Sequence, residues 1–205
     1  MGSPSQERGR FPEEGPQHEV QLTQGFWLCD TPCTQALWQA VIGTNPSGFQ
    51  GEQHPVDSVS WKDCQQFLVA CNQLMPELPL TLPTEAQWEY ACRAGTTTPR
   101  YEAPLDTIAW YVSNSRHTTH AAAQKRPNAW GLYDMLGNVW EWCHDGLRAY
   151  TRHGVSDPVG PTTADADRAL RGGSWGHSAQ DVRAAYRDGS RHSNANIGFR
   201  AASSG

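Results

Sequence analysis

Histidines are the first residues to weigh for catalysis or metal binding in this chain of 205 residues. His117 and His120, in the stretch RHTTH, have a spacing that would place both rings on one face of a helix and so ligate a metal. The neighbouring Thr and Ser residues favour a loop instead, and we expect a solvated pair. His144, His177 and His192 lie apart from one another along the chain, and spacing alone defines neither a Ser/His/Asp triad nor paired carboxylates around them.

Cysteines are the second candidates for chemistry. The chain has six, at Cys29, Cys33, Cys64, Cys71, Cys92 and Cys143. Three disulfides are one alternative, but three of the six fall within helical patterns, where cysteine is commonly a small buried hydrophobe. We therefore expect free and mostly buried thiols. Cys29 and Cys33 are close in sequence, but no second close pair follows, as a zinc site would require.

Composition and charge limit the fold class and the partners. The 9 Trp supply large buried surfaces, while 19 Gly and 14 Pro imply many turns. We expect one domain, residues 1–205, without an internal repeat. A net charge of −5 argues against a nucleic-acid partner. No apolar stretch reaches the length of a membrane span, no signal peptide follows Met1, and the expected free thiols favour the cytoplasm.

The first half of the chain predicts one strand and three helices. Residues 18–28 alternate apolar and polar as a strand entering a core does. A helix over 34–43 is predicted from Thr34 as its cap and Gly43 as its stop, with Leu37 and Val41 on its buried face. Further helices begin at the cap residues Ser60 and Thr84, the second with a capping box to Gln87, and end before Pro76 and at Gly95.

The second half predicts short strands and long loops, because helical periodicity stops after Gly95. IAWYV (108–112), NVWEWC (138–143) and IGFRAA (197–202) are the apolar pieces. We expect residues 171–175, RGGSW, to form a buried strand whose glycines admit close backbone approach, with 198–200 beside it. This frame is structural. Long loops in a compact domain are often functional, which directs attention to residues 143–196.

The tract between Trp175 and Ile197 has the composition of a recognition surface, because Tyr gives contact area and small polar residues give adjustable hydrogen bonds. The ligand-binding positions that we predict are Gly176, His177, Ser178, Asp181, Tyr186, Asp188, Gly189, Ser190, His192, Ser193, Asn194 and Asn196. Tyr186 is the expected anchor, and the histidines predict pH-sensitive binding. Arg183 and Arg187 are expected to pair with carboxylates or carbonyls as part of the scaffold.

An earlier loop is expected to border the same surface. It carries Arg148, Tyr150, Arg152 and His153.

Five motifs in order resemble those of the formylglycine-generating-enzyme, or sulfatase-modifying factor, family. They are MGSP followed by ERGR and EEGPQHEV, then PVDSVSWKDC, LPTEAQWEYACRAG, NAWGLYDMLGNVWEWC, and RALRGGSW with NIGFRAA. The resemblance spans nearly the whole chain. It implies an α+β, C-type-lectin-like fold with two to three short helices, a small irregular antiparallel sheet and many ordered loops. The start at MGSP resembles the interior start of the family domain, which predicts a piece of a longer protein.

The resemblance also implies a structural Ca²⁺ site. The residues that match the family's ligands are Asp134, Gly137, Val139 and Glu141, the middle two through backbone carbonyls. Oxygen ligands suit this hard cation. Alternatively, the carboxylate of Glu141, between Trp140 and Trp142, accepts hydrogen bonds from backbone N–H groups or from an arginine.

The family's oxidase activity is not expected here. It uses two cysteines just after the Gly-Gly-Ser-aromatic segment, which bind copper, and this chain has no cysteine after Cys143. Without a thiolate there is neither the soft ligand that copper(I) requires nor the redox partner, so no copper is expected. The related sulfoxide synthases use three histidines supplied partly by another domain, which is absent here.

The same fold resembles that of variable proteins of diversity-generating retroelements, whose C-terminal tract is rewritten by mutagenesis at adenines. Rewritten asparagine codons reach Gly, His, Ser, Asp, Tyr and Asn, and residues 176–196 hold this set, with Gln180 as a fixed position. The sequence therefore predicts a non-catalytic protein with a diversified surface for a protein or other macromolecular ligand. The alternative is a metal-dependent oxidase or sulfoxide-synthase-type enzyme of the family, or a relative whose polar loop is only solvated surface.

Overall fold

The computed structural model describes residues 1–204, and Gly205, at the end of the predicted domain 1–205, lies outside that range. The helices are α1 (Gln35–Ile42), α2 (Trp61–Leu74) and α3 (Glu85–Arg93), with short 3-10 helices at Pro12–Glu14 and Leu105–Thr107. The strands are β1 (Val20–Gln21), β2 (Phe26–Leu28), β3 (Leu80–Thr81), β4 (Trp140–Gly146), β5 (Val155–Ser156), β6 (Arg168–Arg171), β7 (Arg187–Ser190), β8 (Ile197–Gly198) and β9 (Ala202–Ser204). Regular elements are short, and loops dominate.

The three predicted helices are confirmed, together with their caps. The hydroxyls of Thr34, Ser60 and Thr84 each accept a hydrogen bond from the backbone N–H three residues on. The predicted capping box with Gln87 is present in α3. These side chains satisfy N–H groups that the first turn of a helix leaves without partners, which is why the three helices begin where they do.

The predicted buried face of α1 is wrong. Leu37 is exposed and Val41 only half-buried, whereas Gln35 and Trp38 point into the protein. The indole of Trp38 stacks on Phe67 of α2, with ring centroids 5.2 Å apart. Trp38 is almost fully buried and also packs edge-on against Phe199, so this large aromatic contact sets the orientation of the helix.

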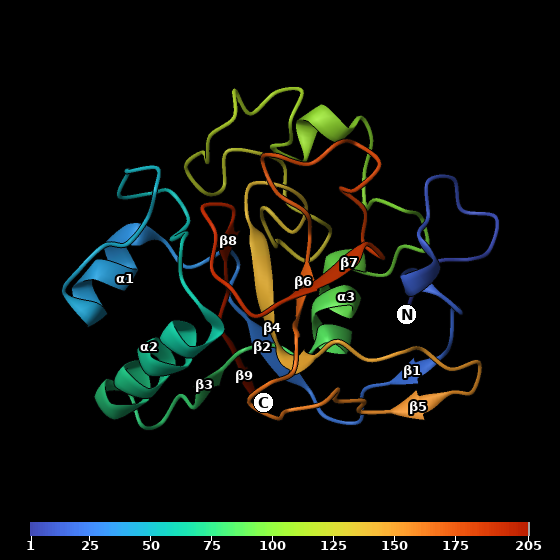
Figure 1. Cartoon of the computed structure of the whole chain (residues 1–205), viewed down its shortest axis with the longest axis horizontal. Coiled ribbons are helices and arrows are strands. Elements are labelled where there is room, and N and C mark those ends of the chain that lie inside the picture. The colour runs from blue at the N-terminus through green and yellow to red at the C-terminus, as the bar shows by residue number, and fades with distance from the viewer. Residues whose placement is uncertain (205) are drawn as a thin grey trace.

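Strands from both halves of the chain form three sheets. β2, β9 and β3 form an antiparallel sheet in that order, and β1 pairs with β5. The largest sheet has the order β7-β6-β4-β8; it is antiparallel except for β8, which runs parallel to β4. In Figure 1, α1 and α2 lie together on one side of this sheet, and α3 lies behind it. Residues 94–139 cover its upper end as loops with one short 3-10 helix.

Three predicted strands take a different form. The one expected over residues 18–28 is divided into β1 and β2, which belong to different sheets. Residues 108–112 form only an isolated bridge, between Trp110 and Gly137. The strand predicted over 171–175 ends at Arg171, because Gly172 and Gly173 have φ of +94° and +71° and turn the chain away. The expected close approach is present, since the carbonyl of Gly172 accepts a hydrogen bond from the N–H of Gly137 at 2.9 Å. An added Cβ at Gly172 would lie 3.1 Å from another carbonyl oxygen.

Candidate recognition surface

We call residues 176–196 the recognition segment. The residues just before it are fixed by buried ion pairs. Arg171 donates to Glu85 at 3.4 Å and to Glu89 at 2.5 Å, and all three side chains are almost entirely buried. Its guanidinium also donates to the carbonyls of Ala184 and Ala185 inside the segment. A buried arginine with carboxylate and carbonyl partners on both sides fixes the base on which the segment lies.

Within the recognition segment, burial separates two classes of residue. All twelve predicted ligand-binding positions are exposed or half-buried. The buried residues are those between them, namely Val182, Arg183, Ala184, Ala185 and Arg187. Ala179, Gln180 and Arg191 are also exposed, so exposure alone does not single out the twelve. Gln180, predicted to be fixed, donates to the carbonyl of Gly9.

The predicted scaffold roles of Arg183 and Arg187 are confirmed. Arg187 donates through Nε and Nη2 to both carboxylate oxygens of Glu85, each at 2.6 Å. Arg183 donates to Glu7 and to both oxygens of Glu14. These ion pairs point inward, and of the three residues between the two arginines only Tyr186 is partly exposed.

The N-terminal residues form part of this surface, which the sequence did not reveal. Besides the ion pairs of Glu7 and Glu14, the ring of Phe11 packs against Tyr186 with centroids 5.3 Å apart. The sequence does contain acidic residues near the N-terminus and arginines near the C-terminus that could pair. The paired residues are more than 160 positions apart, however. No local pattern specifies such a contact.

Aromatic rings form the centre of the surface. Trp140 of β4 contacts both His177, at 5.0 Å between centroids, and Tyr186, at 5.2 Å. Trp140 is buried, while the other two rings are half-buried. Each therefore has one side fixed on the scaffold and the other open, which is the geometry of an anchor side chain at an interface.

The hydroxyl of Ser174 links two separate parts of the segment. It lies 2.7 Å from Nδ1 of His177 and accepts a hydrogen bond from the amide of Asn196 at 3.3 Å. Burial lowers the pKa of His177, although the nearby carboxylates of Asp181 and Asp188 act in the opposite direction. Five predicted positions (His177, Asp181, Tyr186, Asp188 and Asn196) are thus brought together.

Three of the remaining predicted positions, His192, Ser193 and Asn194, lie on the loop after β7, whereas Gly189 and Ser190 end that strand and Gly176 and Ser178 follow Trp175. The hydroxyl of Ser190 donates to the carbonyl of His192, and the carbonyl of Asn194 accepts from the N–H of Ser58. The indole N–H of Trp175 donates to the carbonyl of Ala195 at 3.1 Å. Backbone contacts hold this loop together with the side chains of Ser190 and Asn194, which accept hydrogen bonds from the N–H groups of His192 and Ala195.

The loop expected to border the surface does so only in part. Arg152 and His153 are exposed, but Tyr150 is buried and its hydroxyl donates to Glu85 at 3.2 Å. The guanidinium of Arg187 lies over the ring of Tyr150, 4.0 Å from its centroid. Tyr150 therefore supports the inner side of the recognition segment, which corrects its predicted role as a surface residue.

The histidine pair is in a loop, as expected, but it is not uniformly solvated. His117 is exposed, whereas the ring of His120 stacks on Trp110 with centroids 3.7 Å apart. Nε2 of His120 lies 2.7 Å from the carbonyl oxygen of Ser115. Among residues 1–204, no three His, Cys, Asp or Glu side chains are close enough to hold a metal ion between them.

The predicted calcium ligands differ in their environments. Both carboxylate oxygens of Glu141 accept from Arg200, each at 2.7 Å, and one also accepts from the indole N–H of Trp88. Glu141 thus has the arginine partner that was the alternative. The Oδ1 of Asp134 is buried without a hydrogen-bond partner, and burial raises the pKa of Asp134 to about 6. An unpartnered carboxylate oxygen suits a hard cation, so Asp134 fits a Ca²⁺ site. Glu141 fits it less well, because its charge is already paired with Arg200.

The cysteines are free, as predicted. All but Cys29 are buried. Burial raises the pKa of each thiol, that of Cys92 to about 12. None of them lies in the recognition segment.

Sequence comparison identifies the family. A model of the "sulfatase-modifying factor enzyme 1-like domain" matches residues 1–204. The chain belongs to this family. It is 31% identical to the mouse formylglycine-generating enzyme over 211 residues, which cover 90% of this chain and 53% of the mouse protein. The chain spans about half the length of the formylglycine-generating enzymes that it matches.

Solved structures confirm the fold. Treponema denticola variable protein 1 superposes with a TM-score of 0.83 at 32% identity, covering 91% of this chain and 86% of that one. PvdO from Pseudomonas aeruginosa superposes with a TM-score of 0.86 at 26% identity, covering 100% of this chain and 90% of that one. The fold is α+β, of the C-type-lectin-like type found in the formylglycine-generating-enzyme family. Within residues 1–204, no helix is long and apolar enough to cross a membrane.

Proposed function

We propose that this chain is a non-catalytic ligand-binding protein, the variable protein of a diversity-generating retroelement, with the recognition segment as its diversified surface. The observation that carries the proposal is the division within the segment. The twelve predicted positions are all exposed or half-buried, while Val182, Arg183, Ala184, Ala185 and Arg187 between them are buried. Such a segment can change its surface without changing its scaffold.

Binding would follow from a stiff platform rather than from chemistry. Arg183 and Arg187 hold the segment through buried ion pairs, so little conformational entropy is lost when a ligand docks. Tyr186 and His177 are the aromatic anchors on this platform, and the exposed Ser, Asn and Gly positions supply adaptable contacts. The partner is a protein or another macromolecule, because the segment offers a broad surface.

Two further observations support the proposal. Treponema denticola variable protein 1 shares the fold over most of both chains. The stretch after Trp175, where the family's oxidases carry their two copper-binding cysteines, has no thiol in this sequence. Copper(I) needs such a soft ligand, so the family's oxidase chemistry has no counterpart there.

We also propose that Asp134 is the anchor of a structural Ca²⁺ site, with the carbonyls of Gly137 and Val139 as further ligands and Glu141 nearby. When bound, the cation would supply positive charge to the buried carboxylate of Asp134. Its role would be to stabilise the loop that leads into β4, and it takes no part in a reaction.

Two libraries on the same chain test the main proposal. The first randomises the twelve predicted positions to Gly, His, Ser, Asp, Tyr and Asn, and the second randomises Val182, Arg183, Ala184, Ala185 and Arg187 to the same set. Displayed on yeast, the first library should keep protease-resistant folded clones as a large fraction, and binders to an arbitrary protein should be selectable from it. The second library should be mostly unfolded. Equal loss of folded clones from both libraries would contradict the proposal.

A further inference from the structure

A groove of about 370 Å³ lies between the first turn of α2 and the loop that leads into β6. Three cationic side chains line it, those of Lys62, Arg168 and Arg191, and no carboxylate does. The ring of Trp61 is the largest apolar side chain in the lining. Because the chain as a whole carries a net charge of −5, this lining is a local concentration of positive charge on an acidic protein.

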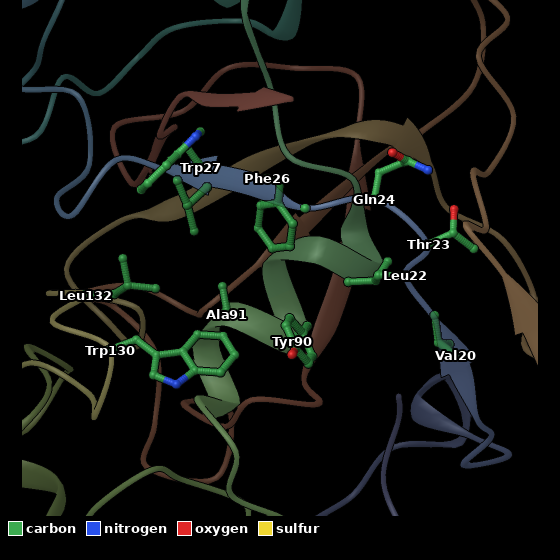
Figure 2. A pocket seen from close by; sticks show the side chains of 12 residues that line it. Val20, Leu22, Thr23, Gln24, Phe26, Trp27, Tyr90, Ala91, Trp130 and Leu132 are labelled. Atoms are coloured by element: carbon green, nitrogen blue, oxygen red, sulfur yellow. The ribbon is translucent and has the colours of Figure 1, made fainter. Parts of the chain in front are cut away.

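Charge distinguishes this groove from a larger one. Figure 2 shows the larger groove, of about 640 Å³, with Phe26 and Tyr90 in its middle and Trp130 towards one end. None of the residues that line it is charged, so its surface suits apolar partners of many kinds. The cationic lining of the smaller groove, in contrast, favours an anionic partner.

Arg168 is a buried arginine that has no carboxylate partner. Five arginine side chains are buried within residues 1–204. Four of them form ion pairs with glutamates, namely Arg171, Arg183, Arg187 and Arg200. The guanidinium of Arg168 donates instead to three backbone carbonyls at 3.0 to 3.2 Å, those of His144, Thr162 and Thr163. A buried cation without an opposite charge is costly, and a carboxylate from a ligand would offset that cost.

Asp145 is a buried carboxylate that acts on Arg168 without pairing with it. Burial lowers the pKa of Arg168, and the charge of Asp145 acts in the opposite direction. The carboxylate of Asp145 accepts hydrogen bonds from the backbone N–H groups of Glu85 and Gly160. Its oxygens are therefore already bonded to the backbone, and the guanidinium is left to the groove.

Arg168 and Trp61 hold each other in place. The guanidinium of Arg168 lies over the ring of Trp61, 4.0 Å from its centroid. The indole N–H of Trp61 in turn donates to the carbonyl of Cys143 at 2.9 Å. Because the cation is fixed by an aromatic ring and by carbonyls before a ligand arrives, little conformational entropy is lost when it binds an anion.

The charges at the rim of the groove limit the kind of anion. Asp165 and Asp167 are exposed on the loop whose alternate residues line the groove, and Asp167 pairs with Nε of Arg191. A polyanion such as a nucleic-acid backbone would lie against these two carboxylates and be repelled. A single carboxylate can reach Lys62 and Arg168 without that repulsion.

We propose that this groove binds the carboxylate of a glutamate or aspartate side chain on a protein partner. Lys62 and Arg168 pair with the carboxylate, because charge-assisted hydrogen bonds to an anion are the strongest that these side chains make. The ring of Trp61, with Ala164 and Ala166, contacts apolar groups on either side of that acidic residue.

The groove adjoins the recognition segment, because Arg191 belongs to both. Trp61, Lys62 and Arg168 lie outside residues 176–196, so they would give every variant of the segment the same contact with an acidic residue. That the groove and the segment bind the same partner rests on the proposed function. The preference for a carboxylate rests on the groove alone.

Two short peptides test the groove on the full chain. The probe is acetyl-Leu-Glu-Leu-amide, and the matched control peptide has glutamine in place of glutamate. In an NMR titration, millimolar glutamate peptide should shift the indole N–H signal of Trp61. The glutamine peptide should bind about tenfold more weakly or less, because it lacks the charge that Lys62 and Arg168 recognise.

A charge reversal in the groove should remove this preference. Lys62 is exposed, so Lys62→Glu should fold as the wild type does and bind the glutamate peptide about tenfold more weakly or less. The matched control is Arg126→Glu, which changes the net charge equally at an exposed arginine outside the groove. This variant should bind the glutamate peptide as the wild type does.

Three results would overturn the inference. They are an unchanged Trp61 signal at millimolar glutamate peptide, equal affinity for the two peptides, and unchanged affinity in Lys62→Glu. Inorganic phosphate that binds at Trp61 more tightly than the glutamate peptide would also overturn it, since the preferred anion would then not be a carboxylate. These outcomes are separate from the proposed function, because the peptides can bind the groove whether or not the recognition segment varies.

Discussion

Arg183 donates hydrogen bonds to both carboxylate oxygens of Glu14, and this buried ion pair connects the recognition segment to the N-terminal segment. The two residues are 169 positions apart, and both side chains are almost fully buried. The pair joins the two ends of the chain under the surface that we propose to bind ligand.

Removing the charge of Glu14 should therefore be costly. Breaking one side of a buried ion pair typically costs about 3–5 kcal/mol. We expect Glu14→Gln to lower the free energy of unfolding by about 3 kcal/mol, at the lower end of that range, because Glu7 still contacts Arg183. Urea denaturation of the wild type and of Glu14→Gln at neutral pH measures this difference in unfolding free energy.

The control is the ion pair between Arg191 and Asp167, in which both side chains are at least half exposed. Exposed pairs contribute about 0–1 kcal/mol, so Asp167→Asn should change the unfolding free energy by less than about 1 kcal/mol. Equal effects of Asp167→Asn and Glu14→Gln would contradict the scaffold role of the Arg183 pair.

His177 should make the fold less stable in mild acid. Burial between Ser174, Trp140 and Tyr186 lowers its pKa below the ordinary value of 6.5. The unfolded chain then binds a proton at higher pH than the folded one, so stability is lost as pH falls below 6.5 towards the lower folded pKa. Urea unfolding between pH 7 and 5 should show a smaller loss for His177→Gln than for the wild type. An NMR titration midpoint for His177 at or above 6.5 would contradict this account.

Replacing Asp134 should change the stability of the protein in opposite directions without and with calcium. Its pKa is raised to about 6 by burial, so without metal its charged form weakens the fold above that pH. Asp134→Asn should raise the melting temperature of the metal-free protein at pH 7. With calcium a hundredfold above its dissociation constant, the wild type should gain about 2.7 kcal/mol, and Asp134→Asn should gain nothing. A wild type whose melting temperature is the same in calcium and in EDTA would refute the proposed site.

Thiol reactivity tests the burial of the cysteines. Only Cys29 is exposed, and burial raises the pKa of the other five. The native protein should react with a thiol reagent at one site, Cys29→Ser should abolish that reaction, and the unfolded chain should titrate six thiols. Fewer than six in denaturant without reductant would reveal a disulfide.

Local signals predicted the helices well. Thr34, Ser60 and Thr84 mark helix starts because a capping hydroxyl acts within three residues. The same reasoning failed for Leu37, because the burial of Trp38 depends on Phe67 in another helix. It also failed at Gly172 and Gly173, where glycine in the left-handed region ends a strand that the apolar pattern would extend.

The sequence predicted which residues form the recognition surface, but not which residues pack beneath it. The outward-facing positions follow from residue types near the C-terminus. The contacts of Phe11, Glu7 and Glu14 beneath them depend on tertiary pairing across nearly the whole chain. Tyr150 shows the same limit, since its aromatic ring suggested a surface contact and its hydroxyl lies on buried Glu85.

Deep sequencing of the 3′ end of the gene in its source population tests the central claim most directly. We predict substitutions concentrated at the twelve outward-facing positions between Gly176 and Asn196. Trp175, Arg183, Arg187 and Gly198 should be unchanged. A recognition segment as invariant as the rest of the chain would contradict a diversified binding surface.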